Sequence, residues 1–256
     1  MKKILKCPLV WIVCSFVIIG LSVFVVLHLT QSTTWFDGQG QNDAYEFPIT
    51  PAGNPDKWKE FQTYQEMLDA CQIPEKKLKV MTTEGLIETC INYPMALNFM
   101  LSDSFVLGYN SVCENFNGLQ ELYARNDCVE KILDFFNSIN IKNLKDVKNA
   151  SLIYRFCCML CSQDNIISRL DSEQQNKLIN TLDLHIKDIR KNYKDFYSEN
   201  APLFAKFKIL KIKYQEFNKL LKDNLYLKYF SETGVWGGIT IEDKEDLLRQ
   251  INNIKK

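Results

Sequence analysis

The residues best suited to chemistry are the nine cysteines and two histidines of this 256-residue chain. Cys158 and Cys161 form its single Cys-x-x-Cys pair, the spacing of thiol redox sites and of half a zinc site. A redox pair lies at a helix N-terminus after a strand, where the thiol pKa is lowered. This pair falls near the end of an apolar helical stretch, and no second pair accompanies it. We expect neither redox nor metal function from it.

Most cysteines fall after the hydrophobic N-terminal segment. They are Cys71, Cys90, Cys113, Cys128, Cys157, Cys158 and Cys161. Those at 71, 90, 113 and 157 lie on apolar stripes with helical spacing, where a thiol packs as a small hydrophobic group. We predict core thiols. Disulfides between adjacent helices are the alternative, because an exported domain meets an oxidising compartment. The odd number would then leave one thiol unpaired, and the sequence does not decide the disulfide state.

The histidines restrict acid–base and metal chemistry. His28 belongs to the apolar N-terminal run, and His185 lies in a helical pattern without another ligand at suitable spacing. A multi-histidine metal site is excluded, and any Ser-His-Asp or Cys-His catalysis would depend on His185 alone. We expect His185 at the surface or at the core boundary. Glycine-rich phosphate loops and hydrolase or zinc-protease motifs are absent from the sequence. We assign no catalytic, cofactor-binding or metal residue, and no cofactor.

One stretch near the C-terminus is rich in lysine. Its members are Lys206, Lys208, Lys211, Lys213, Lys219, Lys222 and Lys228, opposed by Glu216 and Asp223. We favour a solvated face, and a patch for acidic partners or lipid headgroups is the alternative. Trp236, flanked by glycines, either fills the core or presents an aromatic ring for recognition. The net charge of the chain is zero, which argues against a nucleic-acid partner.

The elements that position these residues begin with a hydrophobic segment. Residues 8–29 carry no charge, and three lysines precede them. A helix of this length rises about 33 Å, which matches the ~30 Å hydrocarbon core of a bilayer. We predict that residues 1–30 form an uncleaved transmembrane anchor, with the lysines in the cytoplasm and the remainder outside. A signal peptide removed with residues 1–32 is the alternative, and it would give a secreted protein.

The remaining chain divides into a linker and a helical domain. Residues 31–54 are rich in glycine, proline and polar residues and lack a hydrophobic period, which predicts a flexible linker. Residues 55–256 show helical periodicity and no strand-like alternation. We therefore predict an all-α fold: a transmembrane helix followed by a bundle of about nine helices. A superhelix of stacked helix pairs is the alternative, and a sub-boundary is expected near residue 140.

Capping and stop signals place several predicted helices. Predicted starts are Asn54–Pro55, Thr82, Asp127 and a capping box at Ser172–Gln175, and predicted ends are Pro94 and an Asn117–Gly118 turn. Pro202 is expected to open the longest helix. Its inward seam is predicted to comprise Phe207, Leu210, Tyr214, Phe217 and Leu221. Glu121 and Arg125, four residues apart, are expected to form an ion pair along a helix.

Two segments, 81–94 (MTTEGLIETCINYP) and 116–127 (FNGLQELYARND), carry a resemblance. They are similar to a group of uncharacterised bacterial exported α-helical proteins, over about residues 65–136. In that group a capped helix ends in Tyr-Pro, and a Phe-Asn-Gly-Leu-x-Glu-Leu segment follows. Gly85 departs from the group, which usually has an acidic residue there, and this loses a capping box. The resemblance implies an exported helical module and supplies no activity or site residue.

We expect a non-enzymatic, membrane-tethered helical module that binds a protein or scaffolds an assembly outside the cytoplasm. The anchor, the linker and the lack of catalytic spacing favour this function, but the sequence does not identify the partner or the oligomeric state. The alternative is a hydrolase or transferase that uses aspartate and glutamate as acid and base. Such a pair leaves no reliable signature in sequence. A cleft holding two carboxyl groups with raised pKa would favour the enzyme.

Overall fold

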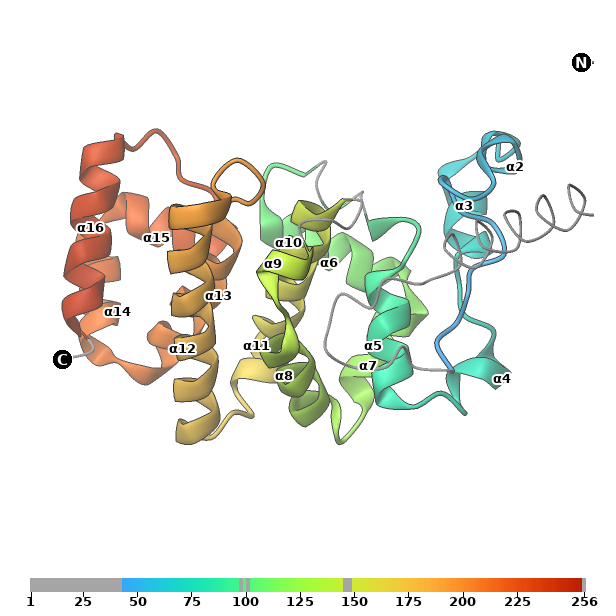
Figure 1. Cartoon of the computed structure of the whole chain (residues 1–256), viewed down its shortest axis with the longest axis horizontal. Helices are drawn as coiled ribbons and strands as arrows, with labels where there is room; N and C mark the ends of the chain where they lie inside the picture. Colours follow the sequence, from blue (N-terminus) through green and yellow to red (C-terminus); the bar gives the residue numbers. More distant parts are fainter. Residues whose placement is uncertain (1–42, 97–98, 100–101, 145–148, 255–256) are drawn as a thin grey trace, which may run out of the picture. The chain divides into compact units, whose positions relative to one another are not determined.

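Helices make up the regular structure of residues 43–96, 99, 102–144 and 149–254, which are the residues that the computed structural model describes (Figure 1). The all-α prediction is confirmed for these ranges. They belong to one packed unit. Within them, the search for a helix of sufficient length and apolarity to cross a membrane finds none. The predicted anchor at residues 1–30 lies outside the described residues.

The helices are shorter and more numerous than the periodicity predicts. In chain order they are α2 (Pro55–Lys59), α3 (Tyr64–Ala70), α4 (Glu75–Leu78), α5 (Thr83–Ile91), α6 (Phe105–Asn115), α7 (Asn117–Ala124), α8 (Cys128–Ser138), α9 (Ile141–Leu144), α10 (Ala150–Cys161), α11 (Asp164–Ile167), α12 (Ser172–Asp188), the π-helical turn η3 (Ile189–Tyr193), α13 (Asn200–Lys213), α14 (Gln215–Asp223), α15 (Leu225–Thr233) and α16 (Ile241–Ile254).

The helix α5 begins with two caps. The side chain of Thr82 accepts a hydrogen bond from the backbone N–H of Gly85 at 3.0 Å, as predicted. Gly85 has no carboxylate to complete a capping box, and Asp43 supplies one instead. Its Oδ2 accepts from the Thr82 backbone N–H at 2.5 Å, and its Oδ1 accepts from the Thr82 hydroxyl at 3.0 Å. A Cβ at position 85 would lie 2.1 Å from Asp43 Oδ1, so this approach requires glycine.

The segment before α2 packs on the helical unit. The backbone N–H of Tyr45 donates to the Thr89 hydroxyl on α5 at 2.8 Å, and the ring of Phe47 lies 6.0 Å from that of Tyr93. Residues 43–54, which the sequence places in a flexible linker, therefore belong to the helical unit. Their aromatic side chains explain this, because Tyr45 and Phe47 pack against the hydrophobic core.

The boundary before α7 and the cap of α8 differ from the predictions, although α8 begins directly after Asp127 as predicted. Asn117 begins α7 and does not form a turn, because its side-chain amide accepts from the Ile73 N–H at 3.0 Å and donates to the Ile73 carbonyl at 2.8 Å. Asp127 precedes α8 without capping it. Its carboxylate accepts from the hydroxyl of Thr83, 2.8 Å away on α5. Both polar side chains therefore form hydrogen bonds with residues about 44 positions away in sequence and do not form the predicted local turn and cap.

The predicted pairing of Glu121 with Arg125 is confirmed, at 3.2 Å. The same guanidinium also donates to the carbonyl oxygens of Leu78 and Met81, at 2.9 and 2.8 Å. Those carbonyls lie at the end of α4, where helical partners are lacking. Arg125 therefore fastens α7 to the chain just before α5.

The long helix predicted from Pro202 is divided at Tyr214. That residue has extended backbone angles (φ −126°, ψ 120°), which end α13 and start α14. The residues of the predicted seam therefore lie on two helices that pack together, and the Phe217 ring of α14 lies 5.2 Å from the Phe207 ring of α13. Phe230 of α15 joins them, and Trp236 stacks on it at 4.1 Å. Trp236 is half-buried and packs against the core, which agrees with the first of its two predicted roles.

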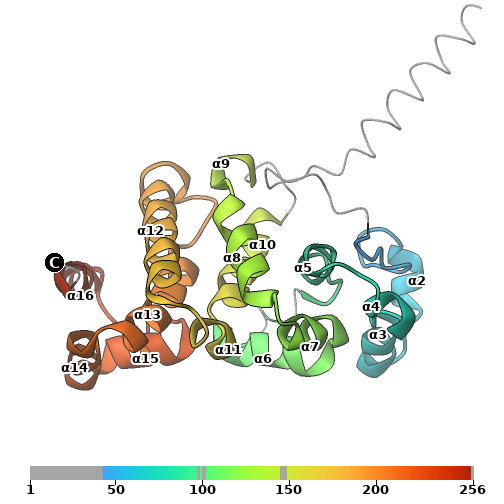
Figure 2. The ribbon, with the colours of Figure 1, turned by 90° about the horizontal axis from the view of Figure 1, so that it is seen from below.

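The helices α12, α13 and α16 hold the candidate site. Figures 1 and 2 show α12 and α13 side by side, and these two helices are in extensive contact. Asp171 opens α12 with a capping box, in which it pairs with Gln174. The box was predicted one residue later, at Ser172–Gln175, because Asp171 and Ser172 are both favourable caps. α16 packs against α14 and buries Leu247, Leu248 and Ile251.

Candidate binding site

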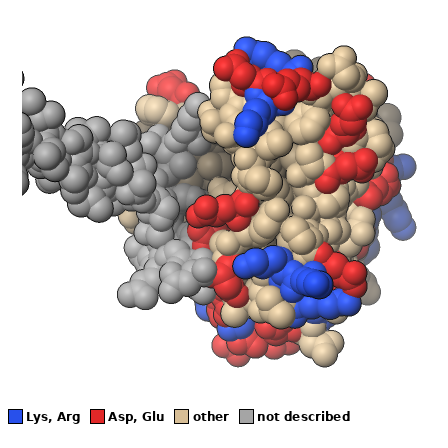
Figure 3. Space-filling view, turned by 90° about the vertical axis from the view of Figure 1, so that its right-hand side faces the viewer, with Lys and Arg blue, Asp and Glu red and all other residues tan. Residues whose placement is uncertain are grey.

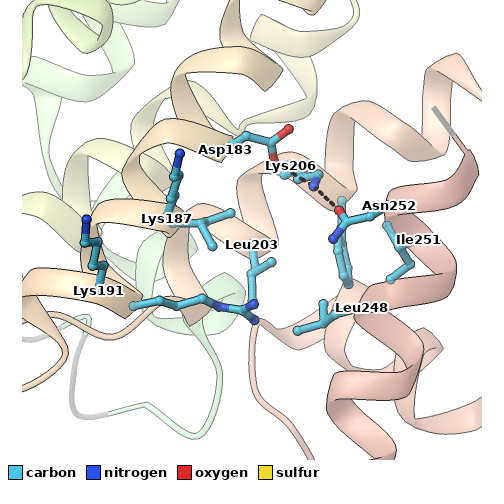
Figure 4. Close-up of a pocket in the computed structure, with 11 residues that line it drawn as sticks. Asp183, Lys187, Lys191, Leu203, Lys206, Leu248, Ile251 and Asn252 are labelled. Carbon is cyan, nitrogen blue, oxygen red and sulfur yellow. Dashed lines mark hydrogen bonds and ion pairs between the residues drawn. The ribbon is translucent and has the colours of Figure 1, made fainter. Parts of the chain in front are cut away.

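A pocket of about 430 Å³ opens between α12, η3, α13 and α16 (Figure 4). Its lining residues are Asp183, Ile186, Lys187, Arg190, Lys191, Leu203, Lys206, Phe207, Leu248, Ile251 and Asn252. The volume falls in the range of small-molecule sites, about 300–1,000 Å³. The lining combines aliphatic and aromatic groups with four cationic side chains and one carboxylate, which is the mixture expected of a site for a charged organic ligand.

The apolar wall follows from helical spacing. Leu203 and Phe207 are four residues apart on α13, and Leu248 and Ile251 are three apart on α16, so each pair lies on one face of its helix. All four side chains are buried. Ile186 of α12 completes the wall. Neighbouring helices cover these side chains almost completely, and together they form the apolar floor of the pocket.

Lys206 lies among these apolar groups, on the buried face of α13. Its side chain is 4% exposed, and its ammonium nitrogen lies 2.7 Å from Asp183 Oδ1 and 3.1 Å from Asn252 Oδ1. Removing an ammonium group from water costs several kcal/mol unless charged and polar partners replace the solvent. Asp183 comes from α12 and Asn252 from α16 (Figure 4). The buried charge therefore links three helices at one edge of the pocket.

Three further cations lie where α12 passes into η3: Lys187, Arg190 and Lys191. The C-terminal end of a helix favours cations because its unpaired carbonyls carry partial negative charge. A π-helical turn is rare and often occurs at functional sites, since it shifts the direction of the side chains after it. Lys187 and Lys191 are solvent-exposed, and Figure 4 shows both on the η3 side of the pocket.

An ion network joins this pocket to a second one beside it. Arg190 pairs with Glu199 and lies 3.3 Å from Glu245, and Lys244 of α16 lies 2.6 Å from Glu199. Burial acts to raise the pKa of Glu199, but hydrogen bonds from Arg190 and Lys244 outweigh it and hold that pKa below its ordinary value. Glu199 thus stays ionised. A general acid needs the opposite shift, so this carboxyl does not support the acid–base alternative.

The structure places His185 in the core, which corrects the expectation of a surface or boundary position. The residue is 8% exposed, and its Nδ1 lies 3.1 Å from the Tyr154 hydroxyl. Burial lowers its pKa to about 4, although a hydrogen bond to the Ile139 backbone acts in the other direction. The ring is therefore neutral at physiological pH and ties α12 to α10. Its neighbours include the Phe136 ring at 5.6 Å, and it does not face the pocket lining.

The seven cysteines among the described residues are thiols, and the core-thiol prediction is confirmed for six of them, which are buried. Cys113 is half-buried. Burial raises the pKa of Cys71 to about 11 and that of Cys113 to about 12, so neither forms the reactive thiolate at neutral pH. The Cys161 thiol lies 3.3 Å from the Cys158 carbonyl oxygen, inside α10. Among the described residues, no group of three metal-ligating side chains is close enough to hold an ion.

The lysine-rich stretch is only partly a solvated face. Lys206 is buried, and Lys208 pairs with Asp164 of α11 at 2.6 Å. Lys211, Lys219 and Lys222 are exposed, as predicted. On the face around α2 to α4, acidic and basic side chains are interspersed among uncharged ones (Figure 3). The cations around η3 differ from that mixed surface because they line a pocket that also contains aliphatic and aromatic side chains.

No protein-family model, curated protein or solved structure matches the chain. The function is therefore argued from the sequence pattern and from the pocket. The sequence analysis names Lys206 and Phe207 but does not place them together with the other pocket residues. One signal was available: Lys206 falls between Leu203 and Phe207, at the spacing of a buried face. A lysine at such a position indicates a buried charge, but its partners Asp183 and Asn252 lie on other helices, and no local pattern identifies them.

Proposed function

We propose that this protein is a membrane-tethered helical binding module whose helical unit lies outside the cytoplasm. The uncharged run at residues 8–29, preceded by three lysines, supports the tether and its orientation. The pocket between α12, α13 and α16 is the observation that carries the binding function. The resemblance of residues 81–94 and 116–127 to bacterial exported helical proteins agrees with this location.

The non-enzymatic reading rests on the chemistry of the described residues. His185 is buried and neutral, and the cysteine thiols at 71 and 113 are held protonated. Glu199 is ionised, and its negative charge is paired with Arg190 and Lys244. These groups support a structural role for the residues that acid–base or nucleophilic catalysis would use. We propose a protein partner for the assembled module, in keeping with a tethered scaffold.

Membrane fractionation and topology test the tether. The full chain should sediment with membranes and resist extraction by carbonate. A protease added to spheroplasts should digest the helical unit. Replacing Ile18 and Ile19 with arginine should release the protein, because each arginine near the centre of a membrane helix costs about 2.5–3.5 kcal/mol. Gln31→Arg with Ser32→Arg, which adds the same charge after the run, should remain in the membrane.

The mass of the membrane-bound chain separates an anchor from a cleaved signal peptide. An anchor retains residues 1–32, whereas cleavage removes them and leaves the helical unit in the soluble fraction. Recovery of the intact chain entirely in the cytosol would refute the tether. For the partner, cross-linking on intact cells should repeatedly recover one membrane or surface protein with the wild type, and the arginine variants at 18 and 19 should lose it.

A further inference from the structure

We infer that the pocket between α12, α13 and α16 binds a small amphiphilic anion, meaning a carboxylate or phosphate head attached to an apolar chain. The inference rests on the proposed binding function and names the ligand class for that site. It follows from two properties that occur together in the pocket: an excess of cationic side chains, with Lys187 and Lys191 on the η3 side, and apolar side chains from α12, α13 and α16 that form its floor.

The charges select an anionic head. Lys187, Arg190, Lys191 and Lys206 line the pocket together with a single carboxylate, that of Asp183. Lys206 is balanced by Asp183, and Arg190 is balanced by Glu199 and Glu245. Lys187 and Lys191 leave an excess of positive charge on the rim, one helical turn apart. Cations next to a low-dielectric wall concentrate the field and attract an anion more strongly than isolated surface lysines do.

The wall selects an apolar tail. Leu203, Phe207, Leu248 and Ile251 form the apolar floor of the pocket and are themselves almost fully buried, so the gain comes from the ligand's tail leaving water. Burying a methylene group contributes about 0.8 kcal/mol. A ligand with both parts therefore gains from both sides of the pocket. The volume of about 430 Å³ suits a small organic molecule.

Three polar contacts hold α16 beside the pocket, so we expect a bound ligand to change the stability of this helix. Asn252 contacts Lys206, Glu245 contacts Arg190, and Lys244 contacts Glu199. These bridges join α16 to η3, to α13 and to Glu199, the residue before α13. A ligand that contacts both the η3 cations and the α16 leucine and isoleucine side chains adds a further link between them. We expect bound ligand to slow amide hydrogen exchange in α16.

The experiment uses the full chain in phosphatidylcholine nanodiscs, with octyl phosphate as the probe. Isothermal titration calorimetry measures binding, and empty nanodiscs supply the background. Octanol, inorganic phosphate and octyltrimethylammonium test the neutral chain, the head alone and the opposite charge. The variant Lys187→Gln/Lys191→Gln removes the rim charge at exposed positions. Lys177→Gln, also exposed on α12 but outside the pocket, is the matched control.

We expect octyl phosphate to bind one-to-one and more tightly than the other three compounds. The double variant should weaken it about tenfold at low salt, and Lys177→Gln by less than about twofold. Phosphatidic acid in the nanodisc should compete if a lipid headgroup is the natural source, and should leave the affinity unchanged if the source is a free amphiphile. Either result agrees with the inference.

Equal affinity for octanol would refute the anionic head, and equal affinity for inorganic phosphate would refute the apolar tail. Unchanged affinity in the double variant, with an unchanged melting temperature, would place any binding elsewhere. The proposed tether is tested separately by fractionation. A protein that is membrane-bound and correctly oriented, yet does not bind octyl phosphate, would overturn this inference alone.

Discussion

The carboxylate of Asp43 accepts hydrogen bonds from both the backbone N–H and the hydroxyl of Thr82, a residue 39 positions later. It occupies the place that an acidic side chain at position 85 takes in an ordinary capping box. Gly85 and Asp43 therefore depend on each other: the glycine leaves room for the carboxylate, and the carboxylate replaces the cap that the glycine cannot provide. This relationship gives the first prediction.

Asp43→Ala should lower the free energy of unfolding by about 1 kcal/mol, the usual effect of losing a cap. Gly85→Glu alone should also destabilise the fold, because its Cβ would overlap Asp43 Oδ1. In the double variant the new glutamate can accept from the Thr82 N–H, so the loss should be smaller than the sum. Urea unfolding of the four proteins measures this coupling. Additive losses would show that Asp43 and Gly85 act independently.

Lys206 supports the fold as well as the pocket. Lys206→Ala should lower the free energy of unfolding by about 2–3 kcal/mol, because it removes packed methylenes and leaves Asp183 and Asn252 without the ammonium. Lys206→Met keeps the stem, so its loss should be smaller. Lys211→Ala, on the same helix but exposed, should change stability by less than about 0.5 kcal/mol. Equal losses at 206 and 211 would contradict the buried position of Lys206.

His185 makes stability depend on pH. Its pKa is about 4 in the folded protein against 6.5 for the free side chain, so the unfolded chain binds a proton first as the pH falls. The stability that the neutral, buried His185 contributes is fully present above pH 6.5 and is lost as the pH falls from 6.5 to about 4. The loss should reach about 3 kcal/mol. Denaturant unfolding at pH 7, 6, 5 and 4 measures it.

His185→Gln is the control for that pH dependence. Glutamine does not titrate, so the free energy of unfolding of this variant should not fall between pH 6.5 and 4 in the way assigned to the histidine. At pH 7 the variant should be less stable than the wild type, because the contacts with Tyr154 and Ile139 change. A wild-type protein with the same slope as the variant would place the titration at another group.

The cysteines should react in an order set by exposure. Peptide mapping under non-reducing conditions should find the seven cysteines from position 71 onward as thiols. Treatment of the native protein with iodoacetamide at alkaline pH should label Cys113 before Cys71 or Cys158, because only Cys113 of these is accessible, and labelling at about pH 7 should be slow because burial raises the pKa of Cys113. All should react once the chain is unfolded in urea, and Cys113→Ser should remove the early label. A disulfide between any two would contradict the structure.

Local signals predicted the helical class and some contacts within single helices. Thr82 caps α5, and the Glu121–Arg125 pair forms as expected, because each uses backbone or side chains within four residues. The apolar stripes also marked core residues such as Phe207 and Leu210. These features are decided by periodicity and capping, which sequence displays directly.

Tertiary contacts decided the features that sequence missed. Asn117 and Asp127 have the composition of turn and cap residues, but distant backbone and hydroxyl groups bind them. Tyr214 satisfies a helical period, yet the packing of Phe217 on Phe207 favours a break there. The pocket depends on the packing of α16 near α12 and α13, which no local pattern specifies. The sequence shows each cationic residue of the pocket, but it does not predict that they lie together in the fold.

The packing of Tyr45 and Phe47 on the helical unit has a consequence for its reach. If residues 1–30 are the anchor, only residues 31–42 separate the bilayer from the first packed residue, in place of the longer spacer ending at 54. Twelve residues span at most about 40 Å when fully extended. The attachment point of the helical unit, at Asp43, would then stay within that distance of the lipid surface, which limits how far the unit can move from the membrane.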